Sequence, residues 1–385
     1  MRGTSISLLS RAFIAVLLIS LACVEPYEKN LGVSRTVFIV DAKLSDDMGN
    51  NYLSLSEAVP GVSGTSFSYL PVEGTDVKLV INDSQTVPLT ELKKGYYVYP
   101  EGFQGKVGDS YQLFFTSRGQ NFASTKEIML PGTEIANITH QFDPKGIKDL
   151  EGKITPSQKI YLDTQDPPGD DNFYYWDWIL YERQAYCRTC VNTLYYRDES
   201  TGNEGECRTG RAWIRDTYDY RCEKPCWEII RNDRINIMKD NFSNGQLIKA
   251  REIANLPIYQ LVGALVDIRQ MNISERTYRY LDRVQSQGQE SGGLADTPPI
   301  TLAGNISSLD DREQPVAGYF IVGSVSHKTY WLDRRDIPGD TPFIGLLSDG
   351  RRANVEPMSQ DLTRPPMAPC LETNTRTAIE PEGWQ

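Results

Sequence analysis

Short β-rich runs separated by turn residues place the strongest constraint on the fold. Seven such runs lie in the first third of the chain, at residues 36–42, 51–59, 76–82, 86–92, 95–100, 110–117 and 121–130. Turn formers separate them, as in the DDMGNN segment after the first run. Strands at this spacing are typical of a β-sandwich. We therefore expect an immunoglobulin-like or carboxypeptidase-regulatory-like sandwich at residues 35–131, although the Cys, Trp, Cys spacing of true immunoglobulin domains is absent.

The sequence of residues 135–350, which follow the predicted sandwich, indicates a second and larger β-rich domain. Residues 173–181 (FYYWDWILY) and 258–271 (IYQLVGALVDIRQM) have the composition of long strands. Beyond them, residues 351–385 are rich in turn formers and proline, so we expect an extended C-terminal tail. The fold class is therefore mainly β.

One helix is predicted in this second domain, at about residues 275–287. Ser274 is a suitable N-cap, and Glu275 complements the positive helix end. Ile273 and Tyr278 occupy the two positions of a hydrophobic staple. Gly288 marks the expected end.

The N-terminus has the pattern of a lipoprotein signal peptide. Arg2 and Arg11 are basic, residues 12–21 are uncharged, and Ala22 places a small residue before Cys23. The uncharged run is shorter than the roughly 20 apolar residues of a transmembrane helix. Residues 1–22 are therefore predicted to be removed and Cys23 to carry lipid, with residues 23–34 as a lipidated tether. The alternatives are an ordinary cleaved signal or a retained anchor.

The charge balance disfavours nucleic acid as a partner. The full chain has a net charge of -11. Removal of Arg2 and Arg11 would take away two positive charges and leave a net charge of -13. Such a chain repels phosphate backbones and anionic headgroups. The lipid on Cys23 is thus the expected link to the membrane.

Six cysteines remain after Cys23, and they predict disulfides. They are Cys187, Cys190, Cys207, Cys222, Cys226 and Cys370. An even count in an exported chain favours disulfide bonds, but six cysteines allow fifteen pairings and the spacing selects none of them. The alternative is a zinc site formed by the two close pairs, Cys187 with Cys190 and Cys222 with Cys226.

Two further segments offer candidate sites. Aromatic residues on both faces of the 173–181 strand are either buried or present one face to a partner, and Tyr174, Trp176 and Trp178 are the candidates for a ligand or partner surface. Residues 163–172 (DTQDPPGDDN) could hold calcium, although they lack the EF-hand spacing. The candidate ligands are Asp166, Asp170 and Asp171.

Signatures of catalysis are sparse. The chain has two histidines, His140 and His327, and neither has a metal-ligand spacing. The sequence contains no nucleophile elbow, phosphate-binding loop or dinucleotide fingerprint. We therefore expect a protein that is not an enzyme and needs no cofactor. The alternative is an extracytoplasmic glycan hydrolase, which needs only a pair of carboxylates.

Four stretches resemble a known family. They are CVEP at residues 23–26, the stretches 79–115 and 266–287, and residues 302–326 (LAGNISSLDDREQPVAGYFIVGSVS). Together they resemble the Bacteroidota lipoproteins of the domain-of-unknown-function family 4249, over roughly residues 23–348. The most specific pieces are Gly304, Asn305 and Ile306, together with residues 315–320 (PVAGYF).

The resemblance implies a location and a class of function. Members are typically outer-membrane lipoproteins encoded beside TonB-dependent receptors, without an established enzymatic role. That implies a lipid-anchored protein, at the cell surface, that binds a ligand or acts as an accessory partner of such a receptor. Many members end in a motif of paired cysteines, glycine and tryptophan, of which this chain keeps only Cys370 and Trp384.

Overall fold

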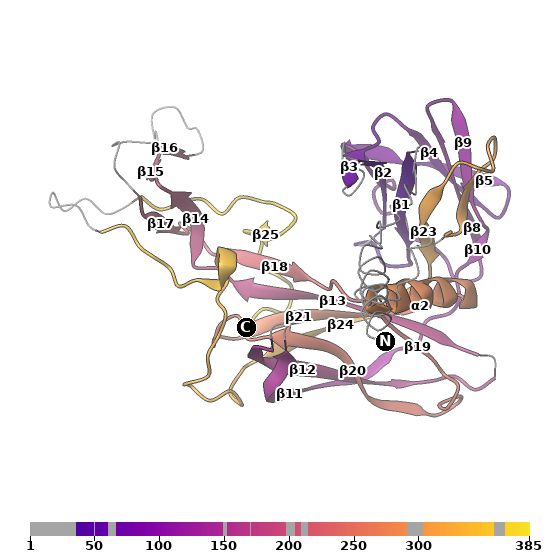
Figure 1. Ribbon diagram of the computed structural model, residues 1–385. Helices are drawn as coiled ribbons and strands as arrows, with labels where there is room; N and C mark the ends of the chain where they lie inside the picture. The colour runs from indigo at the N-terminus through magenta and orange to yellow at the C-terminus, as the bar shows by residue number, and fades with distance from the viewer. Residues whose placement is uncertain are drawn as a thin grey trace, which may run out of the picture.

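The computed structural model describes residues 36–49, 51–60, 67–148, 152–169, 171–197, 205–208, 215–290, 303–357 and 366–385. Within these ranges the chain is mainly β, as predicted, with one α-helix, α2 (Glu275–Glu290), and a 3-10 turn, η1 (Ser348–Gly350). Figure 1 shows a sandwich above one end of a set of long strands and a smaller unit at the other end. The predicted signal peptide, Cys23 and the tether lie outside the described residues.

The sandwich consists of two six-stranded sheets, which we name A and B. Sheet A contains, in order, β23 (Val316–Val322), β1 (Val37–Leu44), β2 (Tyr52–Pro60), β7 (Tyr96–Val98) and β6 (Thr90–Lys93), with β3 (Phe67–Pro71) paired to β2. Sheet B contains β22 (Ile306–Ser308), β9 (Gln120–Ser124), β8 (Ser110–Ser117), β4 (Asp76–Ile81) and β5 (Gln85–Pro88), with β10 (Glu127–Ile128) paired to β8. One hydrophobic core joins the two sheets, as expected for a sandwich.

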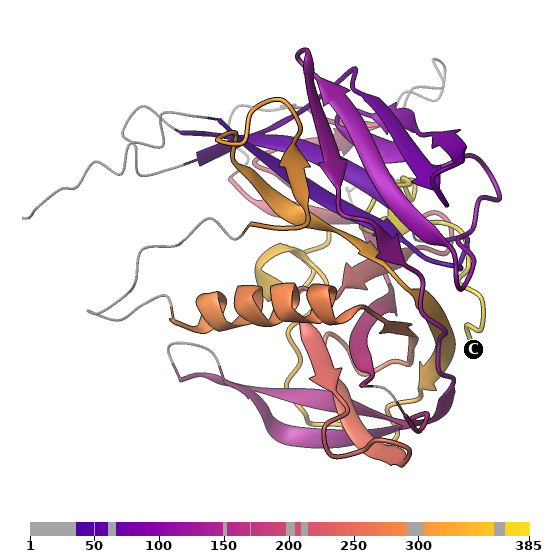
Figure 2. The ribbon, with the colours of Figure 1, turned by 90° about the vertical axis from the view of Figure 1, so that its right-hand side faces the viewer.

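Two strands of this sandwich come from a distant part of the chain. β22 pairs with β9, and β23 pairs in parallel with β1, so that Val40 lies opposite Gly318. The sandwich therefore extends beyond residues 35–131 and includes two strands from the part of the chain predicted to form the second domain. Figure 2 shows the orange β22 and β23 among the purple strands of the N-terminal region. A pairing across such a sequence distance has no local signature.

The motif residues of this returning segment have structural roles. A Cβ on Gly318, whose φ is +103°, would lie 1.8 Å from the Val40 carbonyl oxygen. A Cβ on Gly304 would lie 1.5 Å from the Gly318 carbonyl oxygen. The buried Asn305 amide accepts a 2.8 Å hydrogen bond from Phe320 N–H and donates a 2.9 Å bond to the Phe320 carbonyl. The motif therefore permits close backbone contact and satisfies buried polar groups.

The second domain contains two further sheets, which we name C and D. Sheet C contains β11 (Ile135–Lys148), β12 (Ile154–Gln165) and β20 (Leu247–Pro257). Sheet D contains β24 (Ser324–Leu332), β21 (Ala264–Asn272), β13 (Phe173–Arg183), β18 (Trp227–Arg231) and β25 (Arg376–Thr377), with β19 (Asn236–Lys239) also paired to β13. Side chains from both sheets share a second hydrophobic core. Only Gly323 separates β23 from β24, so one segment passes directly from sheet A into sheet D.

The helix α2 lies between the sandwich and sheet D. Its predicted start is confirmed: Ser274 Oγ accepts a 3.2 Å hydrogen bond from Thr277 N–H, as an N-cap does. Ser274 Oγ also donates a 3.0 Å hydrogen bond to Glu127 of the sandwich. The Tyr278 ring lies 5.2 Å from Phe173 in sheet D, and Tyr280 stacks at 4.7 Å on Tyr319 in sheet A. The helix therefore fills the junction between the domains. No helix within the described ranges is both long and apolar enough to cross a membrane.

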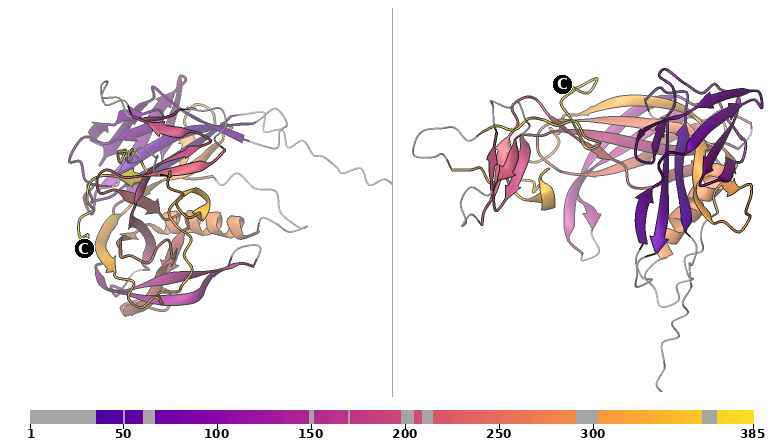
Figure 3. Two further views of the ribbon diagram at one scale, coloured as in Figure 1. Left: turned by 90° about the vertical axis from the view of Figure 1, so that its left-hand side faces the viewer. Right: turned by 90° about the horizontal axis from the view of Figure 1, so that it is seen from above.

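The prediction of disulfides is confirmed. The pairs are Cys187 with Cys222, Cys190 with Cys207, and Cys226 with Cys370. The first two staple a small unit made of β14 (Tyr186–Val191), β17 (Thr217–Arg221), β15 (Leu194–Tyr196) and β16 (Glu206–Arg208). In the right-hand view of Figure 3 this unit lies at the opposite end of the long strands from the sandwich. With all six thiols paired, the alternative zinc site is wrong.

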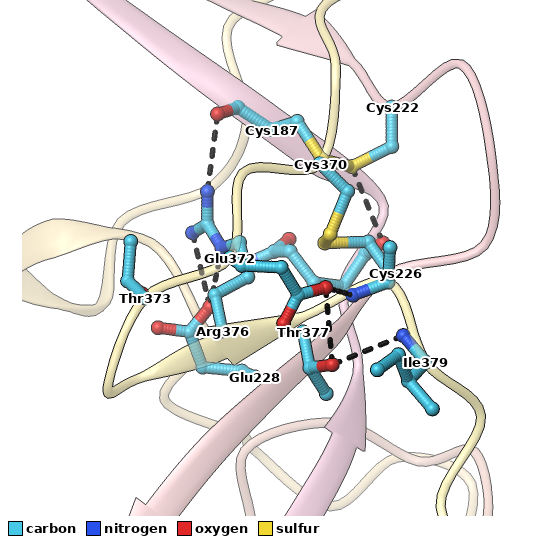
Figure 4. The surroundings of a disulfide bond; sticks show 12 residues. Cys187, Cys222, Cys226, Glu228, Cys370, Glu372, Thr373, Arg376, Thr377 and Ile379 are labelled. Atoms are coloured by element: carbon cyan, nitrogen blue, oxygen red, sulfur yellow. Dashed lines mark hydrogen bonds and ion pairs between the residues drawn. A yellow bond between two sulfur atoms is a disulfide. The ribbon is translucent and has the colours of Figure 1, made fainter.

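The C-terminal segment is attached to the second domain, which corrects the expectation of an extended tail. Its Cys370 bonds to Cys226, as Figure 4 shows, and its β25 pairs with β18. Beside the disulfide, the Arg376 guanidinium donates hydrogen bonds to the Cys187 carbonyl and to Glu228. The Trp384 ring packs edge-on against Trp331 at 5.0 Å. The proline-rich composition of this segment indicates irregular backbone. It does not reveal the disulfide, the strand pairing or the ring contact that hold the segment in place.

Candidate functional site

Strand β13 has a buried face and a face toward a cleft. Tyr174 and Trp176 are fully buried in the core between sheets C and D, and Trp178 is 8% exposed. The prediction of a ligand or partner surface is therefore wrong for Tyr174 and Trp176, whereas Trp178 reaches the lining of a cleft between the two domains. Side chains alternate along a strand, so their neighbours Tyr175 and Asp177 project to the opposite side. The sequence identified the right strand, but two of its three candidates lie on the buried face.

An irregularity in sheet D exposes this second face. Along one side, β13 pairs first with β19 and then with β18. The pairing with β19 stops at Trp176 with Asn236, and the pairing with β18 begins at Ile179 with Arg231. Two residues of β13 thus face four residues, 232–235, in a large bulge. Bulges of this kind redirect side chains and are common next to binding sites.

A cleft of about 620 Å³ lies at this point, between sheet A of the sandwich and sheet D. We call it the interdomain cleft. Its lining contains aromatic rings, carboxylates and basic groups, namely Tyr52, Tyr96, Tyr175, Trp178, Asp41, Asp177, Lys43, Lys93 and Arg231. Such a mixture at a domain junction is typical of small-molecule sites, where apolar surfaces surround a few polar groups.

The sandwich wall of the cleft is formed by β1, β2 and β7. Tyr52 Oη donates a 3.0 Å hydrogen bond to the Asp41 carboxylate, and the Tyr52 ring stacks on Tyr96 with centroids 5.7 Å apart. Asp41 remains in contact with solvent, yet burial by the surrounding walls raises the pKa of its carboxyl; Tyr52 and Lys43 oppose that shift. Burial, followed by the Asp41 charge, raises the pKa of Tyr52, which therefore stays a hydrogen-bond donor.

The opposite wall contributes Asp177, which faces Lys43. The Lys43 ammonium lies 3.5 Å from the Asp177 carboxylate and 5.4 Å from the centroid of the Tyr175 ring. Burial lowers the pKa of Lys43, and the charge of Asp177 opposes this shift. The cleft thus carries acidic and basic groups close together on both walls.

A second hollow, of about 660 Å³, lies on the other side of the bulge and shares Trp178, Arg231 and Asn232 with the interdomain cleft. Its Arg251 donates a 2.7 Å hydrogen bond to Asn236 and stacks over Trp176 at 5.2 Å, so this guanidinium has a structural role. The hollow lies between sheets C and D rather than between domains. We therefore regard the interdomain cleft as the candidate site.

The two calcium candidates that the structure describes, Asp166 and Asp171, lie in different surroundings. Asp166 is fully buried, where it accepts hydrogen bonds from Tyr174 Oη and Gly245 N–H. Asp171 forms an ion pair with Lys239 at 2.6 Å. Asp170 lies outside the described residues. Among the described residues, neither Asp166 nor Asp171 belongs to a group of three side chains close enough to hold a metal ion.

Sequence reasoning missed most of the cleft residues because they come from separate strands. Asp41 and Lys43 are on β1, Tyr96 on β7, Asp177 on β13 and Arg231 on β18. No short spacing connects them. The only local signal was the aromatic stretch at residues 173–181, which indicated the strand but not its orientation.

Comparison with known proteins yields one family. The family described as "Domain of unknown function (DUF4249)" matches residues 24–329, which include the sandwich, the helix and most of sheets C and D. No curated protein and no solved structure matches the chain. The match covers most of the chain and agrees with the resemblance found in the sequence motifs. The chain therefore belongs to the family of domain of unknown function 4249.

Proposed function

We propose that this protein is a ligand-binding lipoprotein of the outer-membrane surface, and that its ligand occupies the interdomain cleft. The observation that carries the proposal is the cleft itself, where aromatic rings from both domains surround charged groups of both signs. Hydrogen bonds also join the two domains outside the cleft: Val325 N–H donates a 2.7 Å hydrogen bond to Asp46, and Gly323 N–H donates a 3.1 Å bond to the Leu44 carbonyl. A preformed cleft lowers the entropic cost of binding.

A neutral ligand with many hydroxyl groups fits this lining best. An anion would be repelled by Asp41 and Asp177, and a cation would be repelled by Lys43 and Arg231. Hydroxyl groups can donate to the carboxylates and accept from the basic side chains. The tyrosine rings in the lining supply apolar surface for C–H groups. A short neutral glycan combines these properties.

The binding test uses calorimetric titration of neutral oligosaccharides. Tyr96→Ala removes one aromatic face, and we expect affinity at least tenfold lower than that of the wild type, on the order of 1.4 kcal/mol. Tyr69→Ala is the matched control, because Tyr69 is an exposed tyrosine of the same sheet A outside the cleft. Equal affinity of the Tyr96→Ala variant and the wild type would place the ligand elsewhere.

The proposal includes lipid attachment at Cys23 and partnership with a TonB-dependent receptor. The support is the signal-like N-terminus, the cysteine at residue 23 and the resemblance to surface lipoproteins. Cys23→Ala should release the protein from the membrane fraction. Purification of the wild-type lipoprotein from its own membranes in mild detergent should bring such a receptor with it. Retention of the Cys23→Ala variant in the membrane would refute lipid attachment at Cys23. Consistent absence of a receptor would refute the partnership.

A glycan hydrolase is the second candidate, because Asp41 and Asp177 line the same cleft and burial raises the pKa of Asp41. Hydrolysis of a glycosidic bond uses a protonated and an ionised carboxyl group. This candidate predicts reducing-end release from bound oligosaccharides that is lost in both Asp41→Asn and Asp177→Asn. Binding without any release by the wild type would favour the non-enzymatic function.

A further inference from the structure

A second cluster of polar side chains lies in the second domain, where β11 comes close to the turn after β24. His140 on β11 and the residues Asp333 and Asp336, in the turn after β24, bring one imidazole and two carboxylates together. The ligand atoms of all three lie within 4.8 Å of one another. His140 Nε2 is 3.6 Å from the nearer Asp336 oxygen, which is longer than a hydrogen bond. These groups therefore face a common point without being bonded to each other.

A buried residue fixes the two carboxylates. Arg334, between Asp333 and Asp336 in sequence, has a φ of +56° and is 3% exposed. Its guanidinium forms an ion pair with the buried Glu182 and donates hydrogen bonds to the backbone carbonyls of Gln260 and Val262. Because Arg334 points inward, the aspartates on either side of it remain at the surface. The Asp333 carboxylate also accepts a 3.1 Å hydrogen bond from Arg335 N–H.

The histidine is also held in a defined orientation. His140 Nδ1 lies 2.8 Å from Tyr330 Oη, and the two rings meet edge-on at 5.7 Å. When Nδ1–H donates to this hydroxyl, the Nε2 lone pair faces the carboxylates. The Asp336 carboxylate accepts a 3.2 Å hydrogen bond from Gln158. Histidines and carboxylates that bind metals in proteins usually have such outer hydrogen-bond partners.

We propose that His140, Asp333 and Asp336 bind a divalent transition-metal ion, with Zn²⁺ as the reference ion. An imidazole nitrogen favours Zn²⁺ and its neighbours in the transition series over Mg²⁺ and Ca²⁺, which prefer oxygen ligands. Three protein ligands leave a fourth tetrahedral position for water or a partner group. The Arg335 side chain, 3.6 Å from Asp333, is largely exposed and can move aside when the ion enters.

The position of this site predicts that a bound metal ion stabilises the second domain. β11 belongs to sheet C, whereas the turn with Asp333 and Asp336 continues β24 of sheet D. A bound ion joins the edges of the two sheets. Because the ion binds the folded state alone, saturating Zn²⁺ raises the thermal midpoint of unfolding.

The test uses the untagged mature chain, oxidised and stripped of metal with a chelator. Calorimetric titration with Zn²⁺ should give one site per chain, and Co²⁺ should give the visible absorption of a tetrahedral ion. His140→Ala and Asp336→Asn should each weaken Zn²⁺ binding at least tenfold. Tyr330→Phe, which removes the partner of Nδ1, should weaken it by about 10- to 100-fold.

Matched controls separate this site from nonspecific binding. His327→Ala removes the chain's other histidine, and Asp340→Asn removes a nearby exposed carboxylate outside the cluster. Both variants should bind Zn²⁺ as the wild type does. Absence of stoichiometric Zn²⁺ binding by the wild type would overturn the proposal, and so would undiminished binding by a folded Asp336→Asn or His140→Ala variant.

Discussion

Lys43 and Asp177 form an ion pair that joins the two domains across the candidate site. Their 3.5 Å contact connects β1 of the sandwich with β13 of sheet D, and both side chains line the interdomain cleft. The side chains are 9% and 22% exposed, so the pair is partly shielded from water. It therefore holds opposite charges in place at the junction before any ligand arrives. The cleft is a product of the domain arrangement rather than of either domain alone.

The raised pKa of Asp41 predicts a specific pH dependence. A carboxyl group whose pKa is higher in the folded than in the unfolded state contributes stability below its ordinary pKa, and this contribution is lost as pH rises through the folded value. Asp41→Asn should therefore remove part of the fall in stability between the ordinary aspartate pKa and neutral pH. Thermal midpoints measured across this range test the prediction. Asp76→Asn, at an exposed position on β4, is the control, and an unchanged pH profile in Asp41→Asn would contradict it.

Gly318→Ala should destabilise the sandwich severely. The new Cβ would lie 1.8 Å from the Val40 carbonyl oxygen at a backbone φ of +103°, so β1 and β23 would have to separate. We expect a loss of at least about 3 kcal/mol of unfolding free energy. Chemical denaturation measures it, with Gly339→Ala as a control because nothing lies within 4 Å of the Cβ position there. Similar midpoints for the two variants would show that the β1–β23 contact is less close than described.

Ser274→Ala should reduce stability by about 1 kcal/mol through loss of the helix cap. The same substitution removes the 3.0 Å hydrogen bond to Glu127 that connects the helix to the sandwich. Ser286→Ala, at an exposed position in the same helix, should change the denaturation midpoint little. If the two substitutions are equivalent, Ser274 does not act as the cap.

Removal of the Cys226–Cys370 disulfide should detach the C-terminal segment. The bond closes a loop with a sequence separation of 144 residues, and loss of a native disulfide typically costs about 2–5 kcal/mol. In the double variant Cys226→Ser, Cys370→Ser, trypsin should cleave faster at Arg376. The double variant Cys190→Ser, Cys207→Ser is the control, because its bond lies within the small unit. Equal protection of Arg376 in both variants would mean that β25 and Trp384 suffice to hold the segment.

Local signals in the sequence predicted the local features of the fold. Alternating runs indicated most of the sandwich strands, and Ser274 indicated the start of the helix. The even number of cysteines indicated disulfides, although their pairing depended on geometry. By contrast, the contact of Val40 with Gly318 and the grouping of Asp41 with Asp177 join residues far apart in the chain. Such contacts depend on how complete sheets pack, so short spacings do not reveal them.

The orientation of β13 illustrates why the candidate site was not predictable from the sequence. Tyr174 and Tyr175 are adjacent residues of the same type, yet one is fully buried in the core and the other lines the cleft. A shift of one residue exchanges the two faces of a strand. Aromatic composition on both faces gave no means of choosing between them.

Hydrogen–deuterium exchange with and without a neutral oligosaccharide tests the central claim most directly, because it locates the bound ligand. Occupation of the interdomain cleft should slow amide exchange in peptides that cover residues 229–235, which include the end of β18 and the bulge beside Asp177. Peptides that cover residues 186–196 of the disulfide-bonded unit should be unchanged. Protection confined to the disulfide-bonded unit, or binding detected by calorimetry without any protection around the cleft, would contradict the assignment of the site.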